Sequence, residues 1–288
     1  MTGGLARLSA AVESVRSRTG GDILLVDVGG FLPKKQDAAA IENMMAAYEL
    51  IGFSAINLSS LDLLMGGELF DLETFSARLP LTSANAVFEK GKKGVPRVMT
   101  VTVGGRHIGM IGISPNIGGF KGQLIKERHG VSFLTVGNVL PPVIRDLRPQ
   151  VDILLLVSHL SYYATRYLVD AHPELDAAIC PKAASAGANH PKILQVSETS
   201  KFVSMAMLKV DADKTVSLTG TETIYTGDFQ PSEQMLGLIG DVQPEACEAD
   251  ESGTVNPNVI HKSKAMLNAL EAEPDAFMRG EMGTKEKK

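Results

Sequence analysis

The sequence predicts an α/β protein of the α+β type, with two packed, mixed β-sheets flanked by helices. Three observations support this fold class. Helix and strand patterns alternate through the first two-thirds of the chain, a clear hairpin pattern lies in its middle, and only strand patterns follow residue 192. Strand–helix units followed by consecutive strands are typical of layered sheets with helices outside them. The 288 residues, 44% of them hydrophobic, suffice to bury one large core.

The N-terminal part predicts two helices and two strands. Residues 5–18 carry apolar side chains at helical spacing, and two glycines then end the helix. Residues 22–28 (DILLVDV) predict a buried strand, in which Asp27 would accept hydrogen bonds from the backbone. Residues 36–51 predict an amphipathic helix with five apolar residues on one face, and residues 53–58 predict a short strand.

The middle of the chain continues this alternation. Residues 81–85 predict a short strand, and residues 96–114 predict a hairpin because two alternating apolar runs surround a Gly-Gly pair. Residues 151–157 and 175–180 read as buried strands on either side of a helix over 161–171. A glycine-rich stretch, residues 115–123, lacks a phosphate-binding pattern and predicts a loop.

The last third of the sequence predicts antiparallel strands, and after them the β pattern ends. Residues 192–227 show β patterns only, with a turn over 211–214. We therefore expect a domain over residues 1–228. Residues 229–288 predict a C-terminal extension with one helix, over 259–272, and a frayed polar tail.

Composition limits the partners and the compartment. A net charge of −5 argues against nucleic acid and anionic membranes. No apolar run has the length of a membrane span, and no secretory signal precedes the first helix. As it stands the sequence predicts a cytoplasmic protein; a truncated N-terminus would instead allow a periplasmic or secreted one. A bridge between Cys180 and Cys247 stays open, although a buried free cysteine is the commoner case.

Several stretches of the chain, taken in order, are similar to motifs of one group of enzymes. They are residues 3–8 (GGLARL), 81–85 (LTSAN), 108–113 (IGMIGI), 147–160 (ending in Ser158-His159-Leu160) and 201–216. In order and spacing they resemble the calcineurin-like metallophosphoesterases, specifically the 5′-nucleotidase and nucleotide-sugar hydrolase branch. The resemblance covers residues 3–225 and implies the layered sheets predicted above.

Most positions that hold metal ligands in that family hold other residues here. The resemblance places Gly30 at the bridging aspartate, Ser60 at the asparagine ligand and Leu61 at the catalytic histidine. Lys182 occupies the position that a metal-binding histidine holds in that family. His159 is the one ligand of the family set that remains, and a histidine after a buried strand is a common position for a metal ligand or base.

The missing ligands decide the expected function. A dinuclear phosphoesterase centre needs several oxygen and imidazole ligands and a carboxylate that bridges two ions. We therefore expect a divergent protein of this fold that needs no cofactor and acts in binding, in interaction or in an altered chemistry. Its ligand would be small and anionic or nucleotide-like, and homo-oligomers remain open. The alternative is a hydrolase of nucleotides or other phosphoesters, with a single divalent metal in an incomplete or N-terminally truncated site.

Four residues are candidates for the site, each with a second interpretation. His159 is a ligand or base, or a histidine held by backbone hydrogen bonds. Asp62 is an acid of the site, or it caps the following helix together with Ser60. Lys182 fills the vacant site by pairing with Asp62 or an anion, or it is a solvated loop residue. Cys180 is a nucleophile or redox group if Lys182 or His159 lowers its pKa.

Overall fold

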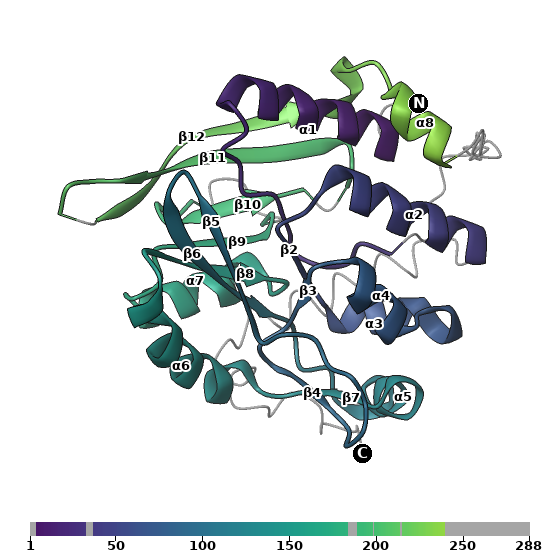
Figure 1. Cartoon of the computed structure of the whole chain (residues 1–288). Coiled ribbons are helices and arrows are strands. Elements are labelled where there is room, and N and C mark those ends of the chain that lie inside the picture. The colour runs from purple at the N-terminus through teal and green to yellow at the C-terminus, as the bar shows by residue number, and fades with distance from the viewer. Residues whose placement is uncertain (1–3, 33–36, 184–188, 198, 214, 240–288) are drawn as a thin grey trace.

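The computed structural model describes residues 4–32, 37–183, 189–197, 199–213 and 215–239. Two β-sheets form its layers, and helices cover their outer faces, as Figure 1 shows. The predicted fold class is confirmed. The larger sheet contains, in spatial order, β10 (Ile193–Val196), β9 (Ala177–Pro181), β8 (Ile153–Ser158), β6 (Arg106–Ile113) and β5 (Val98–Val103). The smaller sheet contains β1 (Val26–Asp27), β2 (Ala55–Asn57) and β3 (Leu81–Thr82), all parallel.

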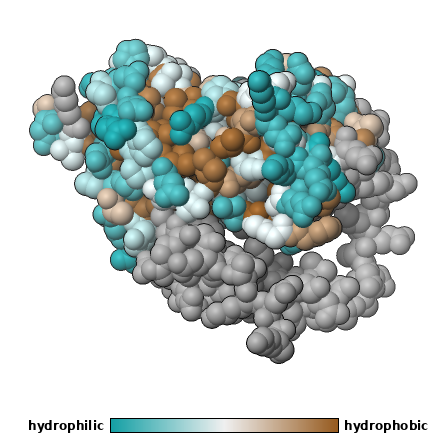
Figure 2. Space-filling model, turned by 90° about the horizontal axis from the view of Figure 1, so that it is seen from below, coloured by the Kyte–Doolittle hydropathy of each residue, from teal (hydrophilic) through white to brown (hydrophobic). Residues whose placement is uncertain are grey.

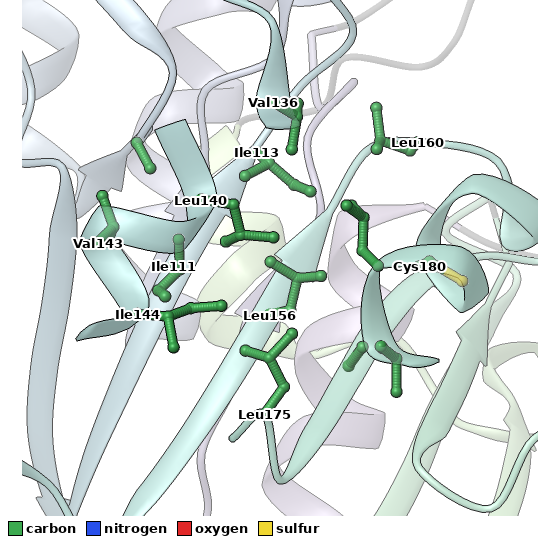
Figure 3. Close-up of a cluster of buried hydrophobic side chains, with 14 of the residues drawn as sticks. Ile111, Ile113, Val136, Leu140, Val143, Ile144, Leu156, Leu160, Leu175 and Cys180 are labelled. Atoms are coloured by element: carbon green, nitrogen blue, oxygen red, sulfur yellow. The ribbon is translucent and has the colours of Figure 1, made fainter. Parts of the chain in front are cut away.

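The central strand of the larger sheet is β8, and all six of its residues are buried. Leu154 and Leu156 face an aliphatic cluster under α6 (Val136–Leu147) and α7 (Tyr162–Ala171), which Figure 3 shows in close-up. Alternate side chains of the same strand point to the opposite face. There they pack against Ala55 of β2 and against the antiparallel pair β11 (Phe202–Val210) and β12 (Val216–Tyr225). A buried strand with apolar residues on both faces is the arrangement expected for residues 151–157.

The smaller sheet is shorter than the sequence predicts. Residues 22–28 were expected to form one buried strand, but only the two residues of β1 pair with β2, and both are half-buried. β1 lies at the edge of its sheet, and Gly29 and Gly30 follow it with positive φ angles. At the edge of the sheet β1 has a partner on one side only, so its residues are half-buried. The two glycines with positive φ then end the strand after Asp27.

The predicted N-terminal helices are confirmed as α1 (Leu5–Thr19) and α2 (Ala38–Ile51). The Asp37 carboxylate accepts a hydrogen bond from Ala40 N and caps the start of α2. The five apolar residues predicted to share one face of α2 are all buried: Ile41, Met44, Met45, Tyr48 and Ile51. The first four pack on the outer face of the smaller sheet, together with α3 (Ser60–Gly66) and α4 (Leu72–Arg78), whereas Ile51 packs toward α1.

Several elements were not expected from the sequence. The loop predicted over residues 115–123 is wrong from Gly119 onward, because α5 (Gly119–His129) begins there. Only Ile125 of α5 is buried, so the helix has little apolar periodicity. Two prolines, Pro141 and Pro142, interrupt the helical pattern of α6. The remaining elements are the strand pair β4 (Ala86–Phe88) and β7 (Val131–Phe133) and the 3₁₀ turns η1 (Gly67–Leu69), η2 (Arg148–Gln150) and η3 (Thr226–Asp228).

The hairpin of residues 96–114 is confirmed as β5 and β6 around Gly104 and Gly105. A short helix after the last strand, α8 (Glu233–Ile239), packs back on the N-terminal helices. Ser232 N donates to Ala6 O, and Asn43 Nδ2 donates to Ile239 O. The helix predicted over 259–272 and Cys247 lie outside the described residues. No described helix is both long and apolar enough to cross a membrane.

Candidate functional site

The site is built where parallel strands of both sheets end. β1 and β2 are parallel, and so are β6 and β8, so the residues after these strands meet at one edge. The Asn57 amide joins the two sheets, because its Nδ2 donates to Val28 O at 2.9 Å and to Ile113 O at 2.8 Å. We call this region the mouth and define it by five residues. They are Gly30, Ser59, Asp62, Ser114 and His159.

Asp62 holds the mouth together as part of a capping box. Ser59 is the N-cap of α3, and its side chain accepts a hydrogen bond from Asp62 N. In return Asp62 Oδ2 accepts from Ser59 N at 3.1 Å and from Ser59 Oγ at 2.6 Å. The capping role considered for Asp62 is therefore present, but the N-cap is Ser59 and not Ser60 or Asp62.

The same carboxylate fixes the loop after β1. Gly30 N donates to Asp62 Oδ2 at 2.9 Å, and Leu32 N donates to Oδ1 at 3.4 Å. Burial raises the pKa of Asp62, although the hydrogen bonds from Ser59 and Gly30 and the nearby His159 act in the opposite direction. Both carboxylate oxygens thus already accept hydrogen bonds from the protein.

A second buried carboxylate lies behind this loop. Asp27 Oδ1 accepts from Gly29 N at 2.8 Å, and Oδ2 accepts from the Tyr48 hydroxyl at 2.9 Å. The expected role of Asp27 as an acceptor of backbone hydrogen bonds is confirmed. Burial raises the pKa of Asp27 to about 6, and burial together with Asp27 raises the pKa of Tyr48 well above its usual value. These two groups shape the Gly29–Gly30 turn and are not open to the mouth.

His159 lies directly in front of Gly30. A Cβ atom added at Gly30 would lie 3.0 Å from His159 Cε1 and 3.7 Å from Leu61 Cδ2. The backbone of His159 continues the sheet, because its N–H donates to Ile113 O at 2.9 Å. His159 Nδ1 is buried and has no hydrogen-bond partner among the described residues. The imidazole therefore occupies the space that a side chain at position 30 would need.

This set of donors does not fit a dinuclear metal centre. Within the described ranges, no three His, Cys, Asp or Glu side chains lie close enough together to hold an ion. The position expected for a bridging carboxylate is Gly30, and the Oδ2 atom of the adjacent Asp62 carboxylate accepts three hydrogen bonds from the protein. No step through two metal ions follows from these residues.

The structure does not bring Lys182 to Asp62. Lys182 is exposed just after β9, where its backbone N–H donates to Val196 O. The groups that contact the Asp62 carboxylate come from Ser59, Gly30 and Leu32. Of the two interpretations of Lys182, its exposure fits a solvated residue at the edge of the sheet.

Cys180 lies in the aliphatic cluster and not in the mouth. Its side chain is fully buried beside residues such as Leu156 and Leu175, as Figure 3 shows. Burial raises the pKa of the Cys180 thiol to about 12. The proposed lowering of this pKa by Lys182 or His159 is therefore wrong, because the apolar surroundings disfavour the thiolate that a nucleophile requires.

Sequence reasoning missed the polar residues that support the mouth from below. Asn85 Nδ2 donates to Ser114 O at 2.8 Å and to Leu134 O at 2.9 Å, while Ser114 N donates to Asn85 Oδ1 at 3.0 Å. Ser114 Oγ accepts from Ser60 N at 2.8 Å. The available signal was that Ser114 directly follows the apolar run of β6 and that Ser60 and Asn85 follow β2 and β3 within three residues, where side chains of different strands can meet.

The rim of the mouth is apolar. Leu61 and Met65 lie one turn apart on α3 and are 40% and 42% exposed. Leu134, next to the Asn85 network, is 47% exposed, and Phe120 at the start of α5 is 79% exposed. Figure 2, which views the molecule from the side where β6 and β8 end, shows hydrophobic residues gathered between two hydrophilic areas. The face around the mouth thus offers apolar contacts more than charged ones.

Comparison with known proteins rests on structure. No protein-family model and no curated protein matches the chain. The sulfate thiohydrolase SoxB of Thermus thermophilus superposes with a TM-score of 0.66 at 17% identity, over 83% of this chain and 46% of that one. A 5′-nucleotidase precursor of the same species, Thermus thermophilus, gives 0.62 at 17% identity, over 83% and 52%. The calcineurin-like phosphoesterase YfkN of Bacillus subtilis gives 0.64 at 15% identity, over 83% and 87%.

The chain spans about half the length of SoxB and of the nucleotidase precursor. All three proteins share its order of strands and helices closely enough to cover most of the described residues. The resemblance seen in the sequence is confirmed at the level of architecture: this chain has the fold of the calcineurin-like metallophosphoesterases, in the form found in 5′-nucleotidases.

Proposed function

We propose that this protein binds a small ligand at the mouth and does not hydrolyse phosphoesters by a two-metal mechanism. The observation that carries the proposal is that the His159 imidazole lies where a side chain at position 30 would begin. A bridging carboxylate at position 30 would meet the imidazole at 3.0 Å from its first side-chain atom. The Asp62 Oδ2 atom also accepts three hydrogen bonds from Gly30 and Ser59, so this oxygen serves the backbone structure of the mouth, where a hydrolase of this fold would need a metal ligand.

The ligand we propose is nucleotide-like. Two proteins of similar fold are described as nucleotidases, one from Thermus thermophilus and the NAD nucleotidase of Haemophilus influenzae. Leu61, beside Gly30, can contact a flat ring, and Phe120, six residues after Ser114 in the chain, is the most exposed large apolar side chain among the described residues. Lys121, exposed beside Phe120, offers a cation to a phosphate group.

Binding and turnover can be measured on the same samples. We expect AMP or ADP to raise the melting temperature of the full chain while chromatography detects no adenosine or phosphate, with or without Mn²⁺. Phe120→Ala should remove the thermal shift. Tyr167→Ala is the matched control, because Tyr167 is a 45% exposed aromatic residue on α7, away from the rim.

Metal analysis can contradict the proposal. It is wrong if the protein binds two Mn²⁺ or Zn²⁺ ions per chain and has phosphatase activity that His159→Ala abolishes. If neither nucleotides nor inorganic phosphate shift the melting temperature, the proposed class of ligand is wrong. That result would not contradict the other part of the proposal, that the protein does not use a two-metal mechanism.

A hydrolase with one divalent metal is the second candidate. One observation favours it: His159 Nδ1 is buried without a hydrogen-bond partner among the described residues, and Asp62 lies nearby. Titration with Zn²⁺, followed by the imidazole signals of His159 in NMR spectra, tests it directly. Saturation at one ion per chain that His159→Ala abolishes would support a single-metal site.

A further inference from the structure

β5 forms the free edge of the larger sheet. Its only strand partner among the described residues is β6, and Figure 1 shows the pair at the border of the layer. The register between them is regular over six residue pairs, from Val98 with Ile111 to Val103 with Arg106. An edge strand with a regular register presents a row of backbone groups to any chain that lies beside it.

The register identifies which backbone groups face outward. Gly104 and Gly105 both have positive φ angles, 54° and 70°, as a two-residue hairpin turn requires. In such a turn the flanking residues, Val103 and Arg106, exchange hydrogen bonds with each other. Because hydrogen-bonded and non-bonded pairs alternate along an antiparallel ladder, Val98, Thr100 and Thr102 direct their N–H and C=O groups away from β6.

This edge lacks the features that usually prevent pairing. The strand reads VMTVTV, with no charge, no proline and no bulge in its register. The edges elsewhere in the described chain differ. β10 has four residues, and the β11–β12 pair has an irregularity between Met205 and Met207 and an acidic residue, Glu222.

We propose that β5 pairs with β5 of a second copy of this chain, antiparallel, about a two-fold axis at Thr100. In this register Thr100 faces Thr100 of the second copy, and Val98 faces Thr102. All three outward-facing residues are then paired, whereas a shift toward the turn would place Val98 opposite Gly104, which cannot continue a strand. A two-fold contact of this kind closes after two copies.

The residues that this register brings together are compatible. Thr–Thr, Val–Thr and Met–Val are β-branched or apolar cross-strand pairs, and no like charges face each other within the strand. Arg97 is exposed just before β5, where its Nε donates to Ala84 O at 3.4 Å, and in this register it comes to lie beside the turn of the second copy. The Asp22 carboxylate lies at that turn, since its Oδ2 is 3.8 Å from the position of a Cβ on Gly104. The two-fold axis creates this opposite-charge contact twice.

A disulfide tests the register. In the full chain with Cys247→Ser, we expect Thr100→Cys to form a disulfide-linked dimer under mild oxidation, because residues facing each other in a hydrogen-bonded pair have Cα atoms about 5.5 Å apart. Thr102→Cys is the matched control. It is also exposed on the same strand, but it faces Val98 and should form no disulfide-linked dimer. Cys180 is buried and does not interfere.

Sedimentation of the unlinked protein tests the contact itself. We expect the wild-type chain to dimerise and Thr100→Pro to weaken dimerisation by roughly tenfold or more, because proline removes an outward N–H and spares the bonds to β6. Thr100→Ala should dimerise like the wild type. Thr100→Lys, which places like charges on the axis, should weaken the dimer even if the proline variant does not fold.

Three results would overturn the proposal. They are a wild-type chain that stays monomeric at high concentration, dimers that Thr100→Lys leaves unchanged, and equal crosslinking through positions 100 and 102.

Discussion

The larger sheet is held in two different ways along the same strands. Under α6 and α7 its side chains form an aliphatic cluster, in which Ile113 and Leu156 are fully buried. One residue after Ile113 and three residues after Leu156, at Ser114 and His159, the interior becomes polar and is held by hydrogen bonds. The change happens at the carboxyl ends of the strands, where the mouth begins.

The two regions respond differently to substitution. An aliphatic cluster loses contacts in proportion to the atoms removed, because its forces have no direction. In the mouth each buried donor has one acceptor, so removing an acceptor leaves a donor without a partner. The backbone of His159 is held by its hydrogen bond to Ile113 O, and its imidazole lies in front of Gly30.

The largest effect should come from the aliphatic cluster. We expect Leu156→Ala to lower the free energy of unfolding by about 3–4 kcal/mol, because it opens a cavity in a fully buried site. Urea denaturation measures this loss. Leu238→Ala, at a 44% exposed position on α8, is the control and should cost under about 1 kcal/mol. Equal losses for the two variants would show that the cluster is not a close-packed core.

In the mouth, Asp62→Ala should cost about 2–3 kcal/mol, because it leaves the N–H groups of Gly30 and Ser59 without acceptors and removes a capping box. Asp62→Asn keeps one carbonyl oxygen and should recover about half of the loss. Denaturation curves of both variants test this difference. A cost below about 0.5 kcal/mol for Asp62→Ala would mean that water replaces the carboxylate.

The contact between Gly30 and His159 predicts a smaller, coupled effect. Gly30→Ala should cost about 1–2 kcal/mol, from a φ of +78° and from the imidazole 3.0 Å away. Gly20→Ala isolates the backbone part, because Gly20 has a similar φ of +68° and nothing within 4 Å. In a His159→Ala background, Gly30→Ala should cost no more than Gly20→Ala. A double-mutant cycle measures the coupling between the two positions. If the two effects are additive, the His159 imidazole does not hinder a side chain at position 30.

Asp27 predicts the smallest effect and a dependence on pH. Its pKa is raised in the folded state from 3.8 to about 6, so the folded protein binds the proton more tightly. The stability contributed at this position therefore falls as pH rises from about 4 to about 6 and is level above that range. Asp27→Asn should gain about 1–2 kcal/mol relative to the wild type at pH 7.5 and nearly nothing at pH 4. Urea denaturation at both values tests the sign, and an advantage that shrinks with rising pH would contradict it.

Local patterns in the sequence were sufficient for most of the fold. The buried face of α2, the hairpin of β5 and β6 and the apolar run of β8 all follow from spacing within one segment. α5 was missed because one buried residue, Ile125, gives no periodic signal. β1 was expected to be longer because its apolar run does not reveal that it lies at the edge of a sheet.

The mouth could be predicted only in part, for the same physical reason. The capping role of Asp62 is local, since Ser59 is three residues away. The network of Asn85 and Ser114 joins segments 29 residues apart, so it depends on how the strands are placed. The burial of Cys180 was expected from its strand, but its raised pKa depends on how completely helices and strands from other parts of the chain enclose it.

The shared use of the Asp62 carboxylate also limits how this sequence can change. One side chain caps α3 and fixes the loop at Gly30, while His159 fills the space in front of that glycine. A carboxylate at position 30 would displace the imidazole and compete for hydrogen-bond donors that Asp62 already uses. The cost of a side chain at position 30 therefore depends on the residue at position 159, and the two positions are coupled. A change at either position is therefore expected to alter the effect of a change at the other.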